Sequence, residues 1–271
     1  MTHTKKTKDT SYMQLLEKKS SLSSRVEPFH CDFGNRIFLG NLGNRLLNAA
    51  DNHSSDRGYG MSYLNTVNKT WVLSRLVIEM DSYPEAYDDI TVDTWVDSVM
   101  RFFTGRNYAV RNTATGQVYG YGRSVWAMID TVDRQPVDIM QVRDGLITHY
   151  IDKDTPCPIE PFRRVKVDSG AECVMEFKAR YSDVDVNGHF NSIKYLEHVM
   201  DIWNAAWHSA HMLKRIDVAY VAEAHMGDTI RIYADRQDTG VWGVIVTRQS
   251  EGDDGQTEAC RCRLTFVERQ Q

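Results

Sequence analysis

The chain has 271 residues, and 42% of them are hydrophobic, so it can bury the core of one large domain or of about two ordinary ones. The formal net charge of −5 argues against a nucleic-acid-binding protein, because such proteins hold phosphates with excess Lys and Arg. It does not exclude an acidic partner, since a basic patch can lie on an acidic protein. No apolar run approaches the roughly 18 residues of a membrane-spanning helix, so we expect no membrane span.

The first residues, 1–26, are interpreted as a polar tail. They carry charge but lack the apolar stretch of a secretory signal, and their Lys-rich composition with two acids disfavours a plastid transit peptide. The chain has five cysteines, an odd number, and no Cys-x-x-Cys pair. This pattern favours reduced thiols over a disulfide framework, and therefore a cytoplasmic protein.

We expect neither a metal ion nor a cofactor. Cys260 and Cys262 are two residues apart on a predicted strand, but no second pair of ligands accompanies them. His208 and His211 are three apart on a predicted helix, and no carboxylate or cysteine is placed to complete a zinc site. These four side chains are expected to be structural.

Each half of the chain repeats the same order of elements, a helix followed by a block of alternating strands. Apolar residues at helical spacing predict a helix over 41–56 in the first half and over 191–207 in the second. Asn191 is the predicted N-cap of the second helix. A Gly-Gln pair also recurs late in each half, at Gly116 and at Gly255. A duplicated unit with loops of unequal length explains this pattern.

The strands follow each predicted helix. Alternating residues over 216–222 and 229–234, joined by a turn at 226–228, are typical of a hairpin. The other predicted strands are 76–79, 90–96, 108–111, 118–129, 244–248 and 257–267. A helix wrapped by an antiparallel sheet, used twice, predicts an α+β protein of two tandem hot-dog folds. The predicted organisation is a tail at 1–26, a first hot-dog domain at 27–140, a proline-containing linker at 141–172, and a second hot-dog domain at 173–271.

Polar side chains gather directly before the second predicted helix. They stand at every second position, so in an extended stretch they would point to one side; they are Asp183, Asp185, Asn187 and His189. The order also resembles the start of a calcium-binding loop. Lys194, however, stands where such a loop requires Glu, which argues against a calcium site.

The string from Ser182 to Tyr195 resembles the signature of the acyl-acyl-carrier-protein thioesterases of plants and bacteria. In that family an Asp-x-Asn-x-His segment precedes the hot-dog helix and a later Tyr-x-x-Glu supplies the last member. The resemblance therefore implies a catalytic set that consists of Asp185, Asn187, His189 and Glu223. Plant enzymes often carry Cys after that Glu, whereas Ala224 stands here, so a thiol nucleophile is not available at that position.

The resemblance implies hydrolysis of a fatty acyl-acyl carrier protein, which releases free fatty acid and ends chain elongation in fatty acid biosynthesis. The acyl carrier protein would be the partner. Such hydrolysis needs a proton acceptor for water, and His189 exchanges protons near neutral pH. Glu223 would activate the water or keep His189 basic, and which of the two is the base stays open. Asn187 and the N–H groups at the helix start would bind the oxyanion, while Asp185 would orient Asn187 or the loop.

The first half lacks an equivalent string. Glu79 is placed like Glu223 but without partners, so we expect one active site, in the second half. By the resemblance, the first half would bind the acyl chain. Two hot-dog domains in one chain already pair with each other, and a homodimer of whole chains stays open.

Three alternatives to this function remain. The first is an acyl-CoA thioesterase, and the sequence does not separate the two acyl donors. The second is a 3-hydroxyacyl thioester dehydratase, whose catalytic His is usually followed by prolines; His189 is followed by Phe-Asn-Ser-Ile-Lys. The third is a protein that binds acyl thioesters without catalysis, which the complete set of polar residues disfavours.

Overall fold

The computed structural model describes residues 15–168 and 170–269, so the first part of the predicted tail, 1–14, lies outside the described residues. The strands, in chain order, are β1 (Lys19–Arg25), β2 (Lys69–Met80), β3 (Asp89–Val99), β4 (Phe103–Asn112), β5 (Val118–Asp130), β6 (Glu172–Lys178), β7 (His211–Tyr220), β8 (Thr229–Asp238), β9 (Val241–Gln249) and β10 (Thr257–Glu268). Within the described residues they form one sheet in the order β1-β3-β4-β5-β2-β7-β10-β9-β8-β6.

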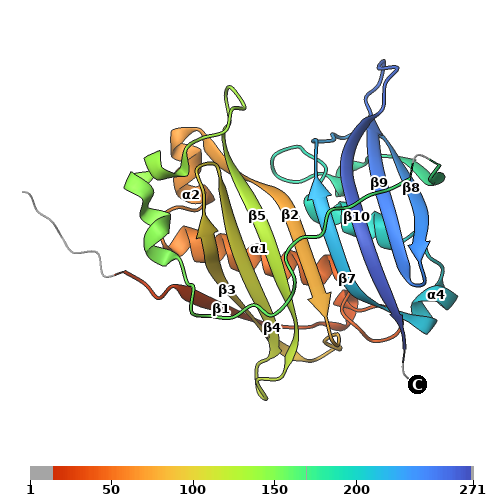
Figure 1. Cartoon of the computed structure of the whole chain (residues 1–271), viewed down its shortest axis with the longest axis horizontal. Coiled ribbons are helices and arrows are strands. Elements are labelled where there is room, and N and C mark those ends of the chain that lie inside the picture. Colours follow the sequence, from red (N-terminus) through yellow and green to blue (C-terminus); the bar gives the residue numbers. More distant parts are fainter. Residues whose placement is uncertain (1–14, 169, 270–271) are drawn as a thin grey trace, which may run out of the picture.

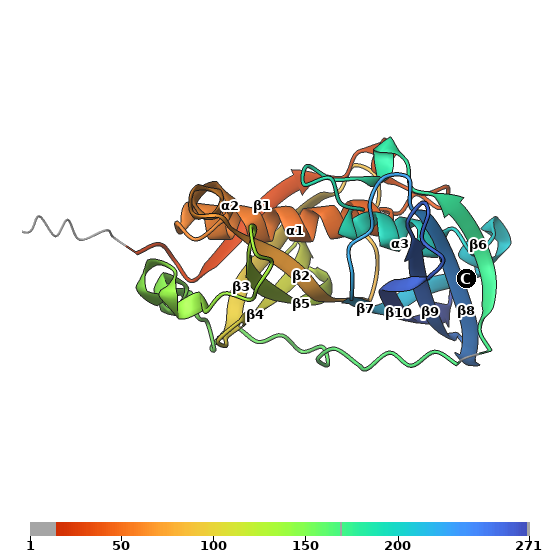
Figure 2. The same ribbon diagram turned by 90° about the horizontal axis from the view of Figure 1, so that it is seen from above.

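The α-helices of the described chain are α1 (Leu39–Asp56), α2 (Met61–Leu64), α3 (Ser192–Met200) and α4 (Ala205–Ala210). Short 3-10 helices precede α1 and α3, follow α2, and lie after β5; they are Pro28–His30, Tyr181–Asp183, Asn65–Val67, Ile139–Gln141 and Arg143–Tyr150. Figures 1 and 2 show α1 and α3 on the same face of the sheet.

The prediction of two tandem hot-dog folds is confirmed. The first half orders its strands β1-β3-β4-β5-β2 around α1, and the second half orders β6-β8-β9-β10-β7 around α3, which is the same pattern. The halves join where β2 pairs with β7 in antiparallel register, with Ile78 opposite Ile216 (Figure 1). Because β2 and β7 are hydrogen-bonded neighbours, the two small sheets form one continuous layer.

The first predicted helix agrees with α1, but the second is interrupted. Asn191 is the N-cap of α3, as predicted: its side-chain Oδ1 accepts a hydrogen bond from the Ile193 N–H at 2.8 Å. The helix ends at Met200, and Asn204 then caps a separate short helix, α4, by accepting from Trp207 N. A second Asn cap inside the apolar pattern therefore divides the predicted helix into two.

The strand pairs β4–β5 and β9–β10 are hairpins, as the repeated Gly-Gln turns predict. The predicted hairpin of β7 with β8 is wrong. Both edges of β7 are occupied, by β2 and β10, and β8 pairs with β9 and β6 instead. The intervening residues, 221–228, carry the chain from the centre of the sheet across to a strand near its edge. Period-two alternation predicts a strand but does not specify its neighbour.

A single apolar core connects the two halves. Leu42 and Leu46 of α1 and Leu196 of α3 are completely buried in it. The two helices approach closely, because a Cβ added at Gly43 would lie 2.7 Å from Cδ1 of Ile193. A larger side chain at Gly43 would force the helices apart, at a cost of roughly 1–3 kcal/mol. This contact fixes the start of α3, where the candidate site lies, against the helix of the other half.

Two predicted boundaries differ from the structure. Residues Lys19–Arg25, assigned to the tail, form β1 and pair with β3. The first part of the predicted linker packs on the first half, where Ile147 and Tyr150 are buried in a second small core with Tyr59. The remaining segment, 152–168, runs along the sheet on the side opposite the helices (Figure 2). The described chain contains no helix with the length and apolarity that crossing a membrane requires.

Candidate active site

The loop before α3 has a backbone organised by one carboxylate. Asp185 Oδ1 accepts hydrogen bonds from the N–H groups of Asn187, at 2.8 Å, and His189, at 3.3 Å. The Asp185 N–H in turn donates to the carbonyl of His189 at 2.8 Å, and Gly188 turns the chain with a φ of +78°. The side chain of Asp185 therefore holds the loop rather than reaching toward a substrate.

This loop is attached to the chain that follows β7. The Phe190 N–H donates to the Ala224 carbonyl at 2.7 Å, and His189 forms an isolated antiparallel bridge with His225. Phe190 is buried in the core, which anchors the end of the loop. At the end of β7, the Tyr220 hydroxyl donates to the Ser192 carbonyl at 2.9 Å, so the first residue of α3 is tied to the strand that leads to the acid.

His189 and Glu223 are brought together by these contacts. The distance from His189 Nε2 to Glu223 Oε2 is 3.5 Å, and both side chains are about one-third exposed or less (27% and 34%). The other oxygen of Glu223 is paired with the guanidinium of Arg134, which lies in the turn after β5. Glu223 therefore bridges an imidazole of the second half and a cation of the first half.

Asn187 and the helix start differ in what they offer to a substrate. The Asn187 side chain is exposed and makes no hydrogen bond within the part of the chain that the structure describes. In contrast, the N–H groups of Ile193 and Lys194 are already used, by the side chain and the carbonyl of Asn191. The helix start is therefore a weaker oxyanion donor than expected, and the Asn187 amide is the better candidate.

Two neighbours of the site were missed by sequence reasoning. Arg134 is 89 residues from Glu223 in the chain, and nothing in its turn distinguishes it from a solvated Arg. His225 lies with its ring edge toward His189, at 5.3 Å between ring centroids. The only signal for His225 was its place two residues after Glu223, which in an extended stretch puts both side chains on one side.

The first half contains a loop with the same backbone but other side chains. Asp32 Oδ1 accepts from the N–H groups of Gly34 and Arg36, at 2.8 and 3.1 Å, as Asp185 does in the second half. Arg36 forms the bridge that His189 forms in the second half, here with Glu85. The Ile37 N–H donates to the Pro84 carbonyl at 2.9 Å, which places Tyr83 in the position of Glu223.

The interpretation of Glu79 as the counterpart of Glu223 is therefore wrong. Glu79 lies within β2 and pairs at 2.7 Å with Arg215, which is buried and also pairs with Asp217. Glu79 thus has partners, and they belong to the junction between β2 and β7. The strand pattern alone placed the matching position at Glu79, whereas the structure places it at Tyr83.

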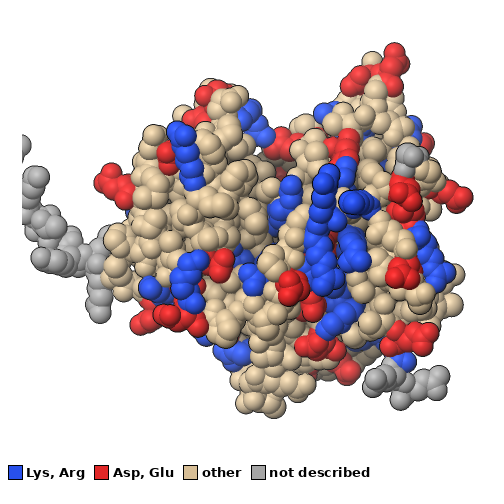
Figure 3. Space-filling model, in the orientation of Figure 1, with Lys and Arg blue, Asp and Glu red and all other residues tan. Residues whose placement is uncertain are grey.

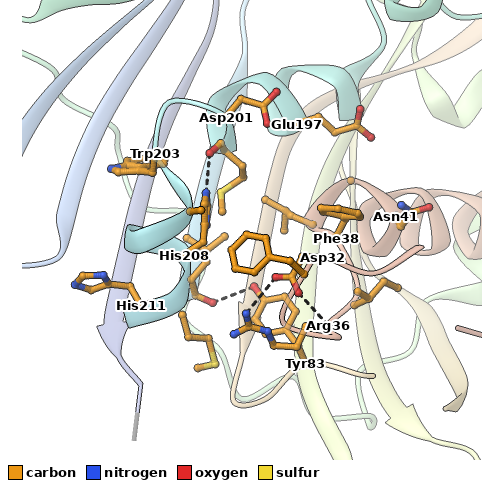
Figure 4. Close-up of a pocket in the computed structure, with 18 of the residues that line it drawn as sticks. Asp32, Arg36, Phe38, Asn41, Tyr83, Glu197, Asp201, Trp203, His208 and His211 are labelled. Atoms are coloured by element: carbon orange, nitrogen blue, oxygen red, sulfur yellow. Dashed lines mark hydrogen bonds and ion pairs between the residues drawn. The ribbon is translucent and has the colours of Figure 1, made fainter. Parts of the chain in front are cut away.

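A cavity of about 540 Å³ lies at the first-half loop, and neither His189 nor Glu223 lines it. Figure 4 shows Asp32, Arg36 and Tyr83 on one side of it and His208 on another. Arg36 is paired with Asp32 there, and the Tyr83 hydroxyl donates to the Leu213 carbonyl at 3.0 Å. Burial raises the pKa of Tyr83, so its phenol stays protonated. The two histidines that line the cavity, His208 and His211, bond to the carbonyls of Met200 and Trp207 and form no ion pair with a carboxylate among the described residues.

Fold and site together define a double hot-dog protein with an acid–base pair at the start of its second central helix. Two family models match the chain: the acyl-ACP thioesterase N-terminal domain over residues 19–146, and the acyl-ACP thioesterase C-terminal domain over residues 167–270. The crystal structure of an acyl-ACP thioesterase from Bacteroides thetaiotaomicron is 42% identical, with a TM-score of 0.85 over 92% of this chain and 98% of that one. The chain belongs to the acyl-ACP thioesterase family.

More distant relatives agree with this assignment. The chain is 29% identical to a chloroplastic palmitoyl-acyl carrier protein thioesterase of Gossypium hirsutum over 67% of this chain and 46% of that protein. It is 27% identical to an oleoyl-acyl carrier protein thioesterase of Arabidopsis thaliana over 70% of this chain and 55% of that protein. The chain thus spans about half the length of these curated relatives. The 12:0-ACP thioesterase of Umbellularia californica, 18% identical with a TM-score of 0.79, shares the fold.

Proposed function

We propose that this protein hydrolyses the thioester of a fatty acyl-acyl carrier protein and releases free fatty acid, with its active site in the second half. The observation that carries the proposal is the approach of His189 Nε2 to Glu223 Oε2, at 3.5 Å, beside a loop whose Asn187 amide has no partner within the described residues. Membership of the acyl-ACP thioesterase family supports the same reaction.

In the proposed reaction, His189 accepts a proton from a water molecule, and the resulting hydroxide attacks the thioester carbonyl carbon. Glu223 holds the imidazole on one oxygen while Arg134 holds its other oxygen. The oxyanion that forms on the carbonyl accepts a hydrogen bond from the Asn187 amide. Collapse of the tetrahedral intermediate breaks the carbon–sulfur bond, and the imidazolium returns its proton to the departing thiolate. Asp185 contributes indirectly, by holding the loop.

The carrier protein is proposed as the partner on the basis of charge. Although the net charge of the chain is −5, Figure 3 shows Lys and Arg gathered in a stripe over β7 and β10. The segment 152–168, which runs along the sheet, exposes three basic side chains: Arg163, Arg164 and Lys166. Arg261 of β10 donates a hydrogen bond to the carbonyl of Val165 beside them. A carrier with an acidic surface would be steered to this stripe. β7 leads directly toward Glu223. Docking of the carrier on this stripe would therefore bring the thioester near the site.

We also propose that the first half binds the acyl chain. Its loop carries no imidazole–carboxylate pair, and α1 packs against the start of α3 at Gly43 and Ile193, so apolar surface of the first half lies beside the helix that the candidate site precedes. A cytoplasmic location belongs to this proposal because all five thiols are free. Self-association of whole chains stays a prediction, to be checked by sedimentation.

The test is product analysis with the purified full chain and a ladder of acyl-acyl carrier proteins, run beside the matching acyl-CoA series. Free fatty acid of a defined length from the carrier series, absent with His189→Ala, supports the proposal. Release from acyl-CoA alone would transfer the activity to that donor. Loss of water from a 3-hydroxyacyl substrate would identify a dehydratase, and binding without any product would leave a non-catalytic protein.

A further inference from the structure

We propose that His189, Glu223 and His225 form a binding site for one divalent transition-metal ion of the zinc class, and that the bound ion inhibits the enzyme. One ligand atom from each of the three side chains lies within 4.8 Å of the others. Two imidazoles and one carboxylate are ligands that zinc prefers, with a fourth position left for water. Calcium and magnesium prefer sets made of oxygen atoms, so these ions are not the expected occupants. Inhibition depends on the proposed hydrolysis, whereas binding does not.

The backbone already positions the three ligands. His189 and His225 are partners in an antiparallel bridge, and residues opposite each other on such a bridge carry neighbouring side chains. Glu223 and His225 are two residues apart on the same short segment, which the Phe190 N–H holds through the Ala224 carbonyl. The site therefore needs little ordering of the chain when an ion binds.

The distances fit a tetrahedral ion with a small adjustment. Bonds of about 2.0–2.2 Å place neighbouring ligand atoms of a tetrahedron roughly 3.3–3.6 Å apart. His189 Nε2 and Glu223 Oε2 are already 3.5 Å apart. His225 must bring its nitrogen closer by at most about 1.5 Å to meet this geometry, and since it is exposed, rotation of its side chain can do so.

Arg134 opposes the ion. Its guanidinium is paired with Glu223, so a dication competes with an existing cation for the same carboxylate. This competition predicts moderate affinity, and it predicts that removing the Arg134 charge strengthens metal binding. A bound ion would occupy both the imidazole and the carboxylate that activate water in the proposed reaction. Inhibition should therefore be reversed by a chelator.

The experiment titrates the untagged full chain with Co²⁺, followed by its visible absorption, and then with Zn²⁺ in competition. The native chain should bind one ion. His225→Ala should lose affinity by more than the about 10–100-fold that an outer-shell change costs. Arg134→Ala should bind more tightly than the native chain. His149→Ala, which removes another exposed histidine, is the matched control and should bind like the native chain.

The outcomes separate this inference from the proposed function. Metal binding that depends on His225, in a chain without thioesterase activity, would leave the metal site standing and remove the proposed function. A hydrolase whose His225→Ala variant binds Co²⁺ as well as the native chain would overturn the metal site. The same holds if His149→Ala weakens binding equally, because the ion would then be held adventitiously. Zinc that binds at these residues but leaves hydrolysis unchanged would overturn the inhibition.

Discussion

The loops at residues 32–37 and 185–190 have nearly the same backbone conformation but carry different functional side chains. In each, an Asp carboxylate accepts two N–H groups, at 2.8 and 3.1 Å in the first half and at 2.8 and 3.3 Å in the second. Each turns through a positive φ, +61° at Asn35 and +78° at Gly188. The first loop ends in an Arg–Asp pair beside a phenol, and the second ends in a His–Glu pair.

Within the Asp-x-Asn-x-His motif, the Asp shapes the backbone of the loop, which we call the frame, and the other two residues offer groups for chemistry. The Asp is part of the frame, because both loops have it and both use it for the same hydrogen bonds. What distinguishes the second loop is Asn187, together with His189 and the Glu223 that lies beside His189. A search for the Asp alone would have found both loops, and only the second has an imidazole that lies beside a carboxylate.

The largest difference between the two loops should appear when the acid of the second half, Glu223, is replaced. Glu223→Gln keeps the size of the side chain but removes the charge beside His189 and Arg134, so hydrolysis should fall by about 10²–10⁴-fold. Tyr83→Phe, the same kind of change at the matching position of the first half, should alter kcat by less than about twofold, since a change away from the reacting atoms removes no transition-state contact. Steady-state hydrolysis of an acyl-acyl carrier protein measures both. A large loss in the Tyr83 variant would mean that the first loop takes part in the chemistry.

The next largest effect is expected from removing the side-chain amide of Asn187. Asn187→Ala should lower kcat by about 10²-fold with little change in KM, because an oxyanion donor acts mainly in the transition state. Stability should hardly change, since the side chain is exposed. A rise in KM at constant kcat would instead show that Asn187 binds the substrate in its ground state.

The two Asp residues should separate stability from activity. Asp32→Ala and Asp185→Ala each remove an acceptor of two backbone N–H groups that are exposed or half-buried, so each should lower the free energy of unfolding by about 0.5–1.5 kcal/mol. Only Asp185→Ala should also slow hydrolysis, because only that loop positions the reactive groups. Urea unfolding and kinetics on the same preparations test this. Equal losses of activity would contradict the division into frame and function.

The smallest expected effect is on the pH dependence of stability, and it comes from a buried histidine of α1. His53 lies on the last turns of α1 and is fully buried, and burial lowers its pKa to about 2. The unfolded chain takes up the proton near pH 6.5, whereas the folded one stays neutral, so stability is present above that pH and lost as pH falls. Between pH 6.5 and 5 the loss should approach about 1.4 kcal/mol per unit. Urea midpoints across this range should vary less for His53→Gln, with His208→Gln as the control.

The double hot-dog fold could be predicted from local patterns in the sequence, and the structure confirms it. The four candidate site residues follow from the family resemblance, and their catalytic roles stay a prediction. The helices follow from apolar spacing, and Asp185, Asn187 and His189 lie within five residues of one another in a recognisable string. Glu223 required the family resemblance, and the structure then placed it 3.5 Å from His189.

The errors arose where distant residues decide the outcome. The partner of β7 depends on β2 and β10, which are far from it in the chain, so alternation could not exclude a hairpin with β8. Arg134 reaches Glu223 only because the two halves join edge to edge. The helix ends at Met200 because Asn204 caps a separate helix, whereas the long apolar stripe predicts one continuous helix.

The antiparallel contact of β2 with β7 has an evolutionary consequence. Two identical subunits related by a twofold axis must carry the same residue at both copies of a position, so neither copy can change alone. Here the matching partners are encoded separately, and a mutation in one is not imposed on the other. Selection could therefore keep an imidazole and a carboxylate at one loop and let the other loop acquire an arginine and a neighbouring tyrosine.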